Sequence, residues 1–143
     1  MAEAAPNLTP QEAVIYLMVM ASASDGRMSE RELRSIGRVV RSFPLFSDAD
    51  EENLVDMAEA CGALMSSEGG LQKVLTAAAS SLPNHLGETA YAAVVEVITA
   101  DENLDMTEIR VLELIRNALD VSDEGAAAIE HAARARHMTL DAV

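Results

Sequence analysis

Two acidic stretches of this sequence follow the same pattern, one in each half of the chain. Residues 25–32 read Asp-Gly-Arg-Met-Ser-Glu-Arg-Glu, and residues 101–108 read Asp-Glu-Asn-Leu-Asp-Met-Thr-Glu. An offset of 76 residues aligns their first aspartates, their last glutamates and the apolar positions that follow. Each stretch follows one apolar run and precedes an amphipathic one, so each is predicted to be the bend of a helical hairpin. An internal repeat constrains the fold strongly, because both halves must then build the same unit.

The residue types favour helices throughout. Half of the 143 residues are hydrophobic, which excludes a disordered chain, and aromatic residues make up only 3%. The apolar residues are mainly Ala, Leu, Val, Ile and Met, of which Ala, Leu and Met are strong helix formers. No alternating β-type run is present. A chain of this length most often forms one domain with a real core, so the sequence predicts a single all-α domain.

Start and stop signals divide the chain into seven predicted helices. They are expected over about residues 9–24, 29–43, 47–65, 71–82, 86–100, 105–119 and 122–137. The first three and the last three are related by the repeat, and the fourth connects them. We therefore expect one compact domain over residues 9–137, with a pseudo-two-fold rotation between its halves and flexible tails at 1–8 and 138–143. The first, second, fifth and sixth helices have the widest apolar faces and are expected to form a central layer, with the sixth deeply buried.

Some helix starts and interior positions can be assigned individually. Thr9, Ser29 and Ser122 each precede a predicted helix as capping residues. Cys61 lies among the apolar positions of the third helix and is interpreted as a small core residue. Glu96 interrupts the apolar run of the fifth helix and is expected to mark its solvent-facing side.

The net charge of −14 argues against nucleic acid as a partner, because phosphate binding needs a basic face. A single cysteine forms no internal disulfide, which fits a reducing cytoplasm. No signal segment is recognisable at the N-terminus. The longest apolar stretch, residues 13–23, is about half of the ~20 residues that a membrane-spanning helix needs. A cytoplasmic location is therefore expected.

Several chemistries find no support in the motifs. The second acidic stretch begins like an EF-hand loop, but Met106 and Leu112 stand where that loop needs Gly and Glu. The three histidines are scattered, no glycine-rich phosphate loop is present, and no Ser/His/Asp or Cys/His grouping can be justified. Paired carboxylates could serve acid–base chemistry, but no nucleophile accompanies them.

The repeated acids have two readings that the residues leave open. Glu32 and Glu108 are sufficiently explained as helix-capping residues. Asp25 and Asp101, however, each follow a helix C-terminus, where the helix dipole disfavours negative charge by ~0.3–1 kcal/mol. Such an acid needs a compensating partner, which could be a backbone amide, an arginine or a cation. Oxygen ligands without cysteine favour Ca²⁺, Mg²⁺ or Mn²⁺, so these four residues are the candidate metal ligands.

A run of arginines is the other notable feature. Arg31, Arg34, Arg38 and Arg41 recur at helical spacing on one face of the second predicted helix. One interpretation is a solvated face that pairs with the acids of the third helix. The other is a docking surface for an acidic partner protein.

The doubled signature resembles the TerB-like tellurite-resistance family, and the resemblance covers about residues 10–137. It rests on Ser-Asp-Gly-Arg-Met-Ser-x-x-Glu at 24–32 and Ala-Asp-Glu-Asn-Leu-Asp-x-x-Glu at 100–108. The chain departs from the family pattern in Ser24, which replaces Ala, and in Glu102, which replaces Gly. Related domains occur beside co-chaperone J-domains. The resemblance implies an all-helical domain with internal pseudo-symmetry, and it implies divalent-metal binding by Asp25, Glu32, Asp101 and Glu108.

The function expected from these features is a soluble TerB-like module that binds a divalent cation, a partner protein or both. It would act in a bacterial tellurite-resistance or stress-response system. Two alternatives remain: a metal-dependent enzyme that uses the paired carboxylates, and a purely structural interaction domain without metal. Binding is favoured over catalysis because no nucleophile, base or cofactor loop accompanies the acids.

Overall fold

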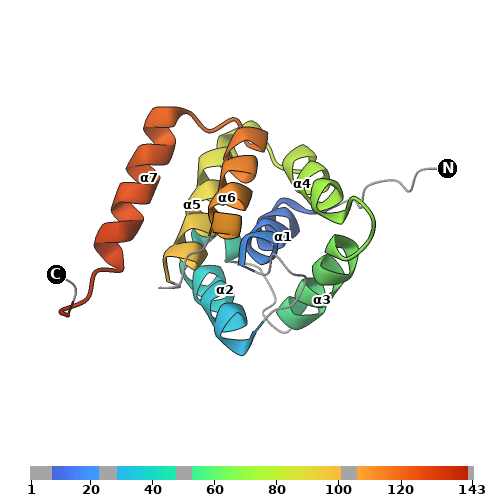
Figure 1. Cartoon of the computed structure of the whole chain (residues 1–143), viewed down its shortest axis with the longest axis horizontal. Coiled ribbons are helices and arrows are strands. Elements are labelled where there is room, and N and C mark those ends of the chain that lie inside the picture. The colour runs from blue at the N-terminus through green and yellow to red at the C-terminus, as the bar shows by residue number, and fades with distance from the viewer. Residues whose placement is uncertain (1–7, 23–28, 48–52, 101–105, 142–143) are drawn as a thin grey trace.

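The computed structural model of the chain describes residues 8–22, 29–47, 53–100 and 106–141 (Figure 1). These residues contain no β-strand and form seven α-helices, which confirms the all-α prediction. The helices are α1 (Pro10–Ser22), α2 (Glu30–Ser42), α3 (Leu54–Met65), α4 (Gly70–Ser80), α5 (Gly87–Thr99), α6 (Met106–Ala118) and α7 (Asp123–Arg136). Short 3-10 helices lie at Pro44–Phe46 (η1) and Asn84–Leu86 (η3). Within the described ranges, no helix has the length and apolar character to cross a membrane.

The predicted capping residues stand at three helix starts. The backbone N–H of Glu12 donates to Thr9 Oγ1 at 3.1 Å, and the backbone N–H of Thr9 donates to a Glu12 carboxylate oxygen at 2.9 Å. At α7, Ser122 Oγ accepts from the N–H of Gly125 at 3.0 Å. Each cap satisfies a backbone donor that the helix leaves unpaired and contributes about 1 kcal/mol. These local contacts explain why the sequence located the starts of α1 and α7.

A short 3-10 helix follows α2. Phe43 ends α2 in an extended conformation, as expected for a residue before proline. The chain then forms η1, and α3 is described from Leu54; residues 48–52, where the third helix was predicted to begin, lie outside the described residues. Phe46 of η1 is only 3% exposed, and the Gln11 side-chain amide donates to the carbonyl of Leu45 at 2.9 Å. The short helix thus attaches to α1 and contributes to the core.

Helix α1 lies at the centre of the fold. Its residues 13–21 are all buried, and it packs against α3, α4 and α5, with α7 and α3 at opposite edges of the molecule (Figure 1). A helix that is apolar on every side is stable only when other helices surround it. Helix α5 is the second central element and packs against α1, α2, α6 and α7.

The expected central layer is correct for α1 and α5 and wrong for α2 and α6. Among the described side chains of α6, only Val111 and Ile115 are buried, and Ile109 is 37% exposed. Helix α2 buries one face and exposes its arginines. The apolar face of α6 is therefore only partly buried among its described side chains, and α1, α4 and α5 are its main packing partners there.

Some of the packing pairs, apart from those of α4, are the ones that the sequence repeat predicts. The pair α1–α3 corresponds to α5–α7, α1–α2 corresponds to α5–α6, and the crossed contacts α1–α6 and α2–α5 both occur. Exchanging the two halves leaves this set of pairs unchanged, which is what a pseudo-two-fold axis between α1 and α5 would produce. The superposition of the halves themselves stays a prediction.

Cys61 is a buried core residue, as expected. Its side chain is fully buried in α3, and its thiol donates to the carbonyl oxygen of Tyr16 at 3.6 Å. Burial raises the pKa of the Cys61 thiol from its ordinary value of 9.0 to about 12. A neutral thiol in this position is a poor nucleophile, because thiolate is the reactive form.

The raised pKa predicts a loss of stability in alkali. Between pH 9 and 12 the unfolded thiol ionises while the folded thiol stays protonated, so stability is full below pH 9 and falls above it. The slope approaches about 1.4 kcal/mol per pH unit. Burial also raises the pKa of Tyr16 and Tyr91, which adds to the loss above pH 10. Urea denaturation of wild type and Cys61→Ala between pH 8 and 10 measures this, and identical slopes from pH 9 to 10 would contradict it.

Candidate functional site

Of the four predicted metal ligands, only Glu32 has a described side chain. Asp25 and Asp101 lie outside the described residues, and Glu108 lies within α6 but its side chain is not described. Glu32 is described, and its carboxylate accepts from the backbone N–H of Ser29 at 3.0 Å. Ser29 Oγ in turn accepts from the N–H of Glu32 at 3.1 Å, which completes the predicted capping box. No group of three or more His, Cys, Asp or Glu residues that could hold a metal occurs among the residues with described positions.

The helix ends that lead into the two acidic segments lie at one place. Ser22 ends α1 and is followed by the first segment, and Ala100 follows α5 and is followed by the second. Both residues line one cavity of about 30 Å³, together with Glu32 at the start of α2. Its remaining lining residues are Arg31, Ser35, Val97 and Ile98. The cavity has room for one or two water molecules, and it marks one end of the molecule as the origin of both acidic segments.

The four arginines of α2 line a single open groove. Arg31, Arg34, Arg38 and Arg41 are all exposed, and Ala100 at the end of α5 provides the other wall of a hollow of about 370 Å³. Arg38 also donates to Ser35 Oγ within its own helix, at 3.0 Å. No acidic residue lines this groove among the described positions. We call it the arginine groove, and it begins beside the small cavity because Arg31 and Ala100 line both.

A larger hollow adjoins the arginine groove between α2, α5 and α7. It measures about 660 Å³ and shares Arg38 and Ala100 with the arginine groove. Val39 of α2, Phe43 directly after that helix and Ala92 of α5 give it an apolar side. We call it the interhelix groove. Glu96, Arg136 and His137 form its far wall.

Ion pairs and a hydrogen bond between α5 and α7 hold these residues in place. The Glu96 side chain is only 14% exposed and binds both Arg136 and His137 at the end of α7. Tyr91, itself 1% exposed, donates to a Glu130 carboxylate oxygen at 2.7 Å. The expectation that Glu96 faces solvent is therefore wrong. No sequence signal revealed the pairing, because its partners lie 40 and 41 positions further along the chain.

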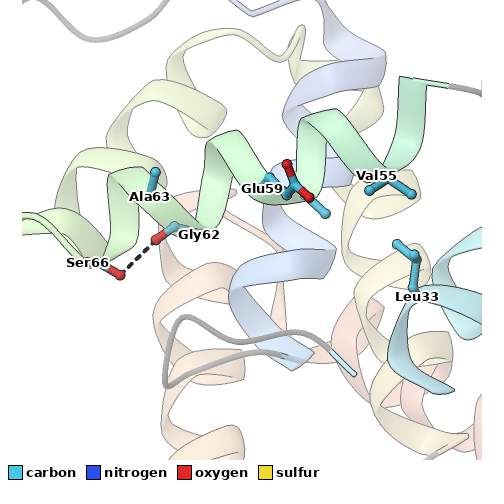
Figure 2. Close-up of a pocket in the computed structure, with 7 residues that line it drawn as sticks. Leu33, Val55, Glu59, Gly62, Ala63 and Ser66 are labelled. Atoms are coloured by element: carbon cyan, nitrogen blue, oxygen red, sulfur yellow. Dashed lines mark hydrogen bonds between the residues drawn. The ribbon is translucent and has the colours of Figure 1, made fainter. Parts of the chain in front are cut away.

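Another hollow runs along α3, where Leu33 of α2 lies opposite Val55, and Glu59, Gly62 and Ala63 line it further along the helix (Figure 2). It measures about 350 Å³, and Glu59 is its only ionisable residue among the described positions. The hydroxyl of Ser66 donates to the carbonyl of Gly62 at 3.0 Å, as the dashed line marks. Without a base beside this serine in the described lining, the hollow offers a surface for contact and not a catalytic pair.

Comparison with known proteins identifies a family. The family model described as "Tellurite resistance protein TerB" matches residues 11–131, which is most of the chain. No curated protein and no solved structure gives a match to this chain. The matched range runs from the first turn of α1 into the second half of α7 and includes both acidic segments and all four arginines of α2.

Proposed function

Because the chain belongs to the TerB family of tellurite-resistance proteins, we propose that it is a helical binding module that holds a divalent cation between its two acidic segments. The ligands are Asp25, Glu32, Asp101 and Glu108, and the cation is Ca²⁺, Mg²⁺ or Mn²⁺. The setting is a bacterial tellurite-resistance or stress response in the cytoplasm. The observation that supports the proposal most directly is the cavity that Ser22, Glu32 and Ala100 share.

Chain connectivity links this cavity to the proposed ligands. Asp25 follows Ser22 by three residues, and Asp101 directly follows Ala100. The described residues that precede the two aspartates, Ser22 and Ala100, lie at the end of the molecule where Glu32 lies. Carboxylates gathered at one place repel each other, and a divalent cation relieves that repulsion while its preference for hard oxygen ligands is met.

The capping role of Glu32 is compatible with cation binding. An ionised carboxylate offers about four acceptor positions on its two oxygens, and the N–H of Ser29 uses one of them. The capping box also fixes the side chain at the start of α2, so that little rotamer freedom remains to be lost on binding. Glu32 can therefore cap α2 and bind the cation at the same time.

Thermal unfolding in the presence of metal tests the proposal. Protein stripped with chelator is expected to melt at a higher temperature when millimolar Ca²⁺, Mn²⁺ or Mg²⁺ is added. A ligand that binds only the folded state stabilises it by about 2.7 kcal/mol at a concentration about 100 times Kd. The double variant Asp25→Asn with Asp101→Asn should lose this rise completely, and isothermal calorimetry should show the same loss.

A matched control separates site chemistry from general charge effects. Asp56 and Glu59 are exposed acids on α3, so Asp56→Asn with Glu59→Gln removes the same charge elsewhere and should keep the metal-dependent rise. In chelator, the Asp25/Asp101 variant should be no less stable than wild type, because it removes repulsion. Flat melts and flat calorimetry for wild type with every ion would leave the acids as helix caps only. The chain would then be a structural interaction domain without metal.

The rival enzyme reading has less support. A metal-dependent enzyme needs a substrate-sized cleft beside its carboxylates, and the cavity that contains Glu32 has a volume of only about 30 Å³. Cys61, the chain's one thiol, is buried in the core with a raised pKa. Binding is therefore the function that the described geometry supports best.

A further inference from the structure

We propose that α2 and the interhelix groove beside it form a docking surface for an acidic amphipathic helix of a partner protein. Carboxylates on one side of that helix would pair with Arg31, Arg34, Arg38 and Arg41. Apolar side chains on its neighbouring side would enter the interhelix groove against Val39, Phe43 and Ala92. The proposed contacts use none of the proposed cation ligands, although Arg31 and Ala100 also line the small cavity beside Glu32.

The arrangement of the arginines indicates a helical occupant. Their spacing of three, four and three residues places them in one row, which extends for about 15 Å along α2 at about 1.5 Å per residue. A partner helix that lies along α2 can present acids at the same spacing over the same length. Helices recognised in this way insert apolar anchors at helical spacing into a groove and use charged positions beside them for orientation.

The residue type points to carboxylates as ligands. All four basic groups are arginine, whereas the chain's one lysine, Lys73, lies on α4. The planar guanidinium binds a carboxylate through two parallel hydrogen bonds, which the point charge of lysine does not provide. Since no acid lines the arginine groove among the described positions, a partner that brings carboxylates meets no like charge in the described wall of that groove.

The interhelix groove adds the apolar half of the surface. Phe43 and Ala92 are partly exposed, and both line the hollow of about 660 Å³ that joins the arginine groove at Arg38 and Ala100. The acid that lines this hollow, Glu96, is paired with Arg136 and His137. It therefore presents little uncompensated negative charge to an acidic partner.

Other occupants fit the charge distribution less well. Nucleic acid and anionic membrane surfaces bring extended negative charge, which a chain of net charge −14 repels outside the arginine groove. A second copy of this chain carries the same net charge and is repelled in the same way. A single acidic helix is small enough to contact the arginines and the interhelix groove alone.

A designed peptide tests the docking surface. The probe is a fluorescent helix of about 18 residues with Glu at positions i, i+3, i+7 and i+10 and Leu on the adjoining face, and its scrambled sequence is the reference. In chelator and at low salt, fluorescence anisotropy should detect binding of the designed peptide and not of the scrambled one. Arg34→Glu with Arg38→Glu should weaken binding by about tenfold or more, and added salt should weaken wild-type binding, because steering by exposed charges is screened.

Two further variants test the apolar part of the surface and the effect of the same charge change elsewhere on the protein. Ala92→Gln fills the interhelix groove without adding charge and should also reduce affinity. Lys73→Glu with Arg110→Glu makes the same charge change on α4 and α6 and should leave affinity within about twofold. Melts of every variant show whether it is folded, and the use of chelator keeps the result independent of the cation site.

Several results would overturn the proposal. Equal binding by wild type and the Arg34/Arg38 variant would do so, as would an equal loss in the Lys73/Arg110 control. Preferential binding of single-stranded oligonucleotides or phosphatidylserine vesicles would assign the arginines to a different ligand. A dimer in sedimentation that the Arg34/Arg38 variant abolishes would make a second copy the occupant. If the peptide binds only after Asp101, Glu102 and Asp105 are neutralised, the chain's own acidic segment covers the arginines.

Discussion

Replacing Leu17 with alanine is expected to lower the free energy of unfolding by about 2–5 kcal/mol. Leu17 is fully buried in α1, the helix that α3, α4 and α5 surround. Truncating it removes apolar area from the core and leaves a cavity that the neighbouring helices cannot close without disturbing each other. Because a domain of this size is stable by only about 5–15 kcal/mol, the loss is a large fraction of the total. Urea denaturation followed by circular dichroism measures it.

The same substitution at an exposed leucine is the control. Leu140 follows α7 and is fully exposed, so Leu140→Ala should change the free energy of unfolding by no more than about 0.5 kcal/mol. If Leu17→Ala also costs less than about 1 kcal/mol, far below the usual cost of a buried leucine, α1 is not the central helix of the fold.

Replacing Gly70 with alanine is expected to cost about 3 kcal/mol, at the upper end of what overpacking usually costs. Gly70 begins α4, and a Cβ atom there would lie well inside van der Waals contact with the carbonyl oxygens of Leu64 and Met65. These atoms belong to the backbone of α3 and cannot rotate away as a side chain would. To relieve the contact, α4 has to shift relative to α1, α3 and α6. Thermal and urea melts of the variant measure the cost.

The neighbouring glycine is a matched comparison that works by another mechanism. Gly69 has a φ of 67°, and a Cβ atom added there would meet no atom within 4 Å. Gly69→Ala should therefore lower the free energy of unfolding only by the cost of a left-handed backbone, about 1–2 kcal/mol. Part of this cost is offset because alanine makes the unfolded chain less flexible. A greater loss at Gly69 than at Gly70 would contradict this assignment of the two glycines.

The parts of the fold that the sequence predicted correctly depend on neighbouring residues. Thr9 and Ser29 cap helices through residues three positions away, and proline after Phe43 ends α2. The burial of Phe46 and its 3-10 turn depends instead on α1, whose Gln11 lies 34 residues from the carbonyl it binds. Hydrophobic periodicity likewise located α6 but not its depth, because burial depends on how many helices pack against it.

The candidate site shows the same division. Helical spacing was sufficient to place Arg31, Arg34, Arg38 and Arg41 in one row. The sequence did not reveal that Ala100 forms the opposite wall or that Glu96 lines the adjoining interhelix groove. Both depend on the packing of α5 beside α2 and α7. That the two acidic bends share one side stays a prediction of the repeat, since the described structure shows only that Ser22 and Ala100, which precede them, line one cavity.

The central position of α1 also affects how the chain folds during synthesis. The helix is apolar on every side, and α5, one of its main partners, ends only at Thr99. At ~5–20 residues per second, the ribosome needs several seconds to extend the chain from Ser22 to that point. During this time the nascent chain cannot bury α1 in its final environment. The helix with the longest run of buried apolar residues, 13–21, therefore depends on protection from aggregation before release.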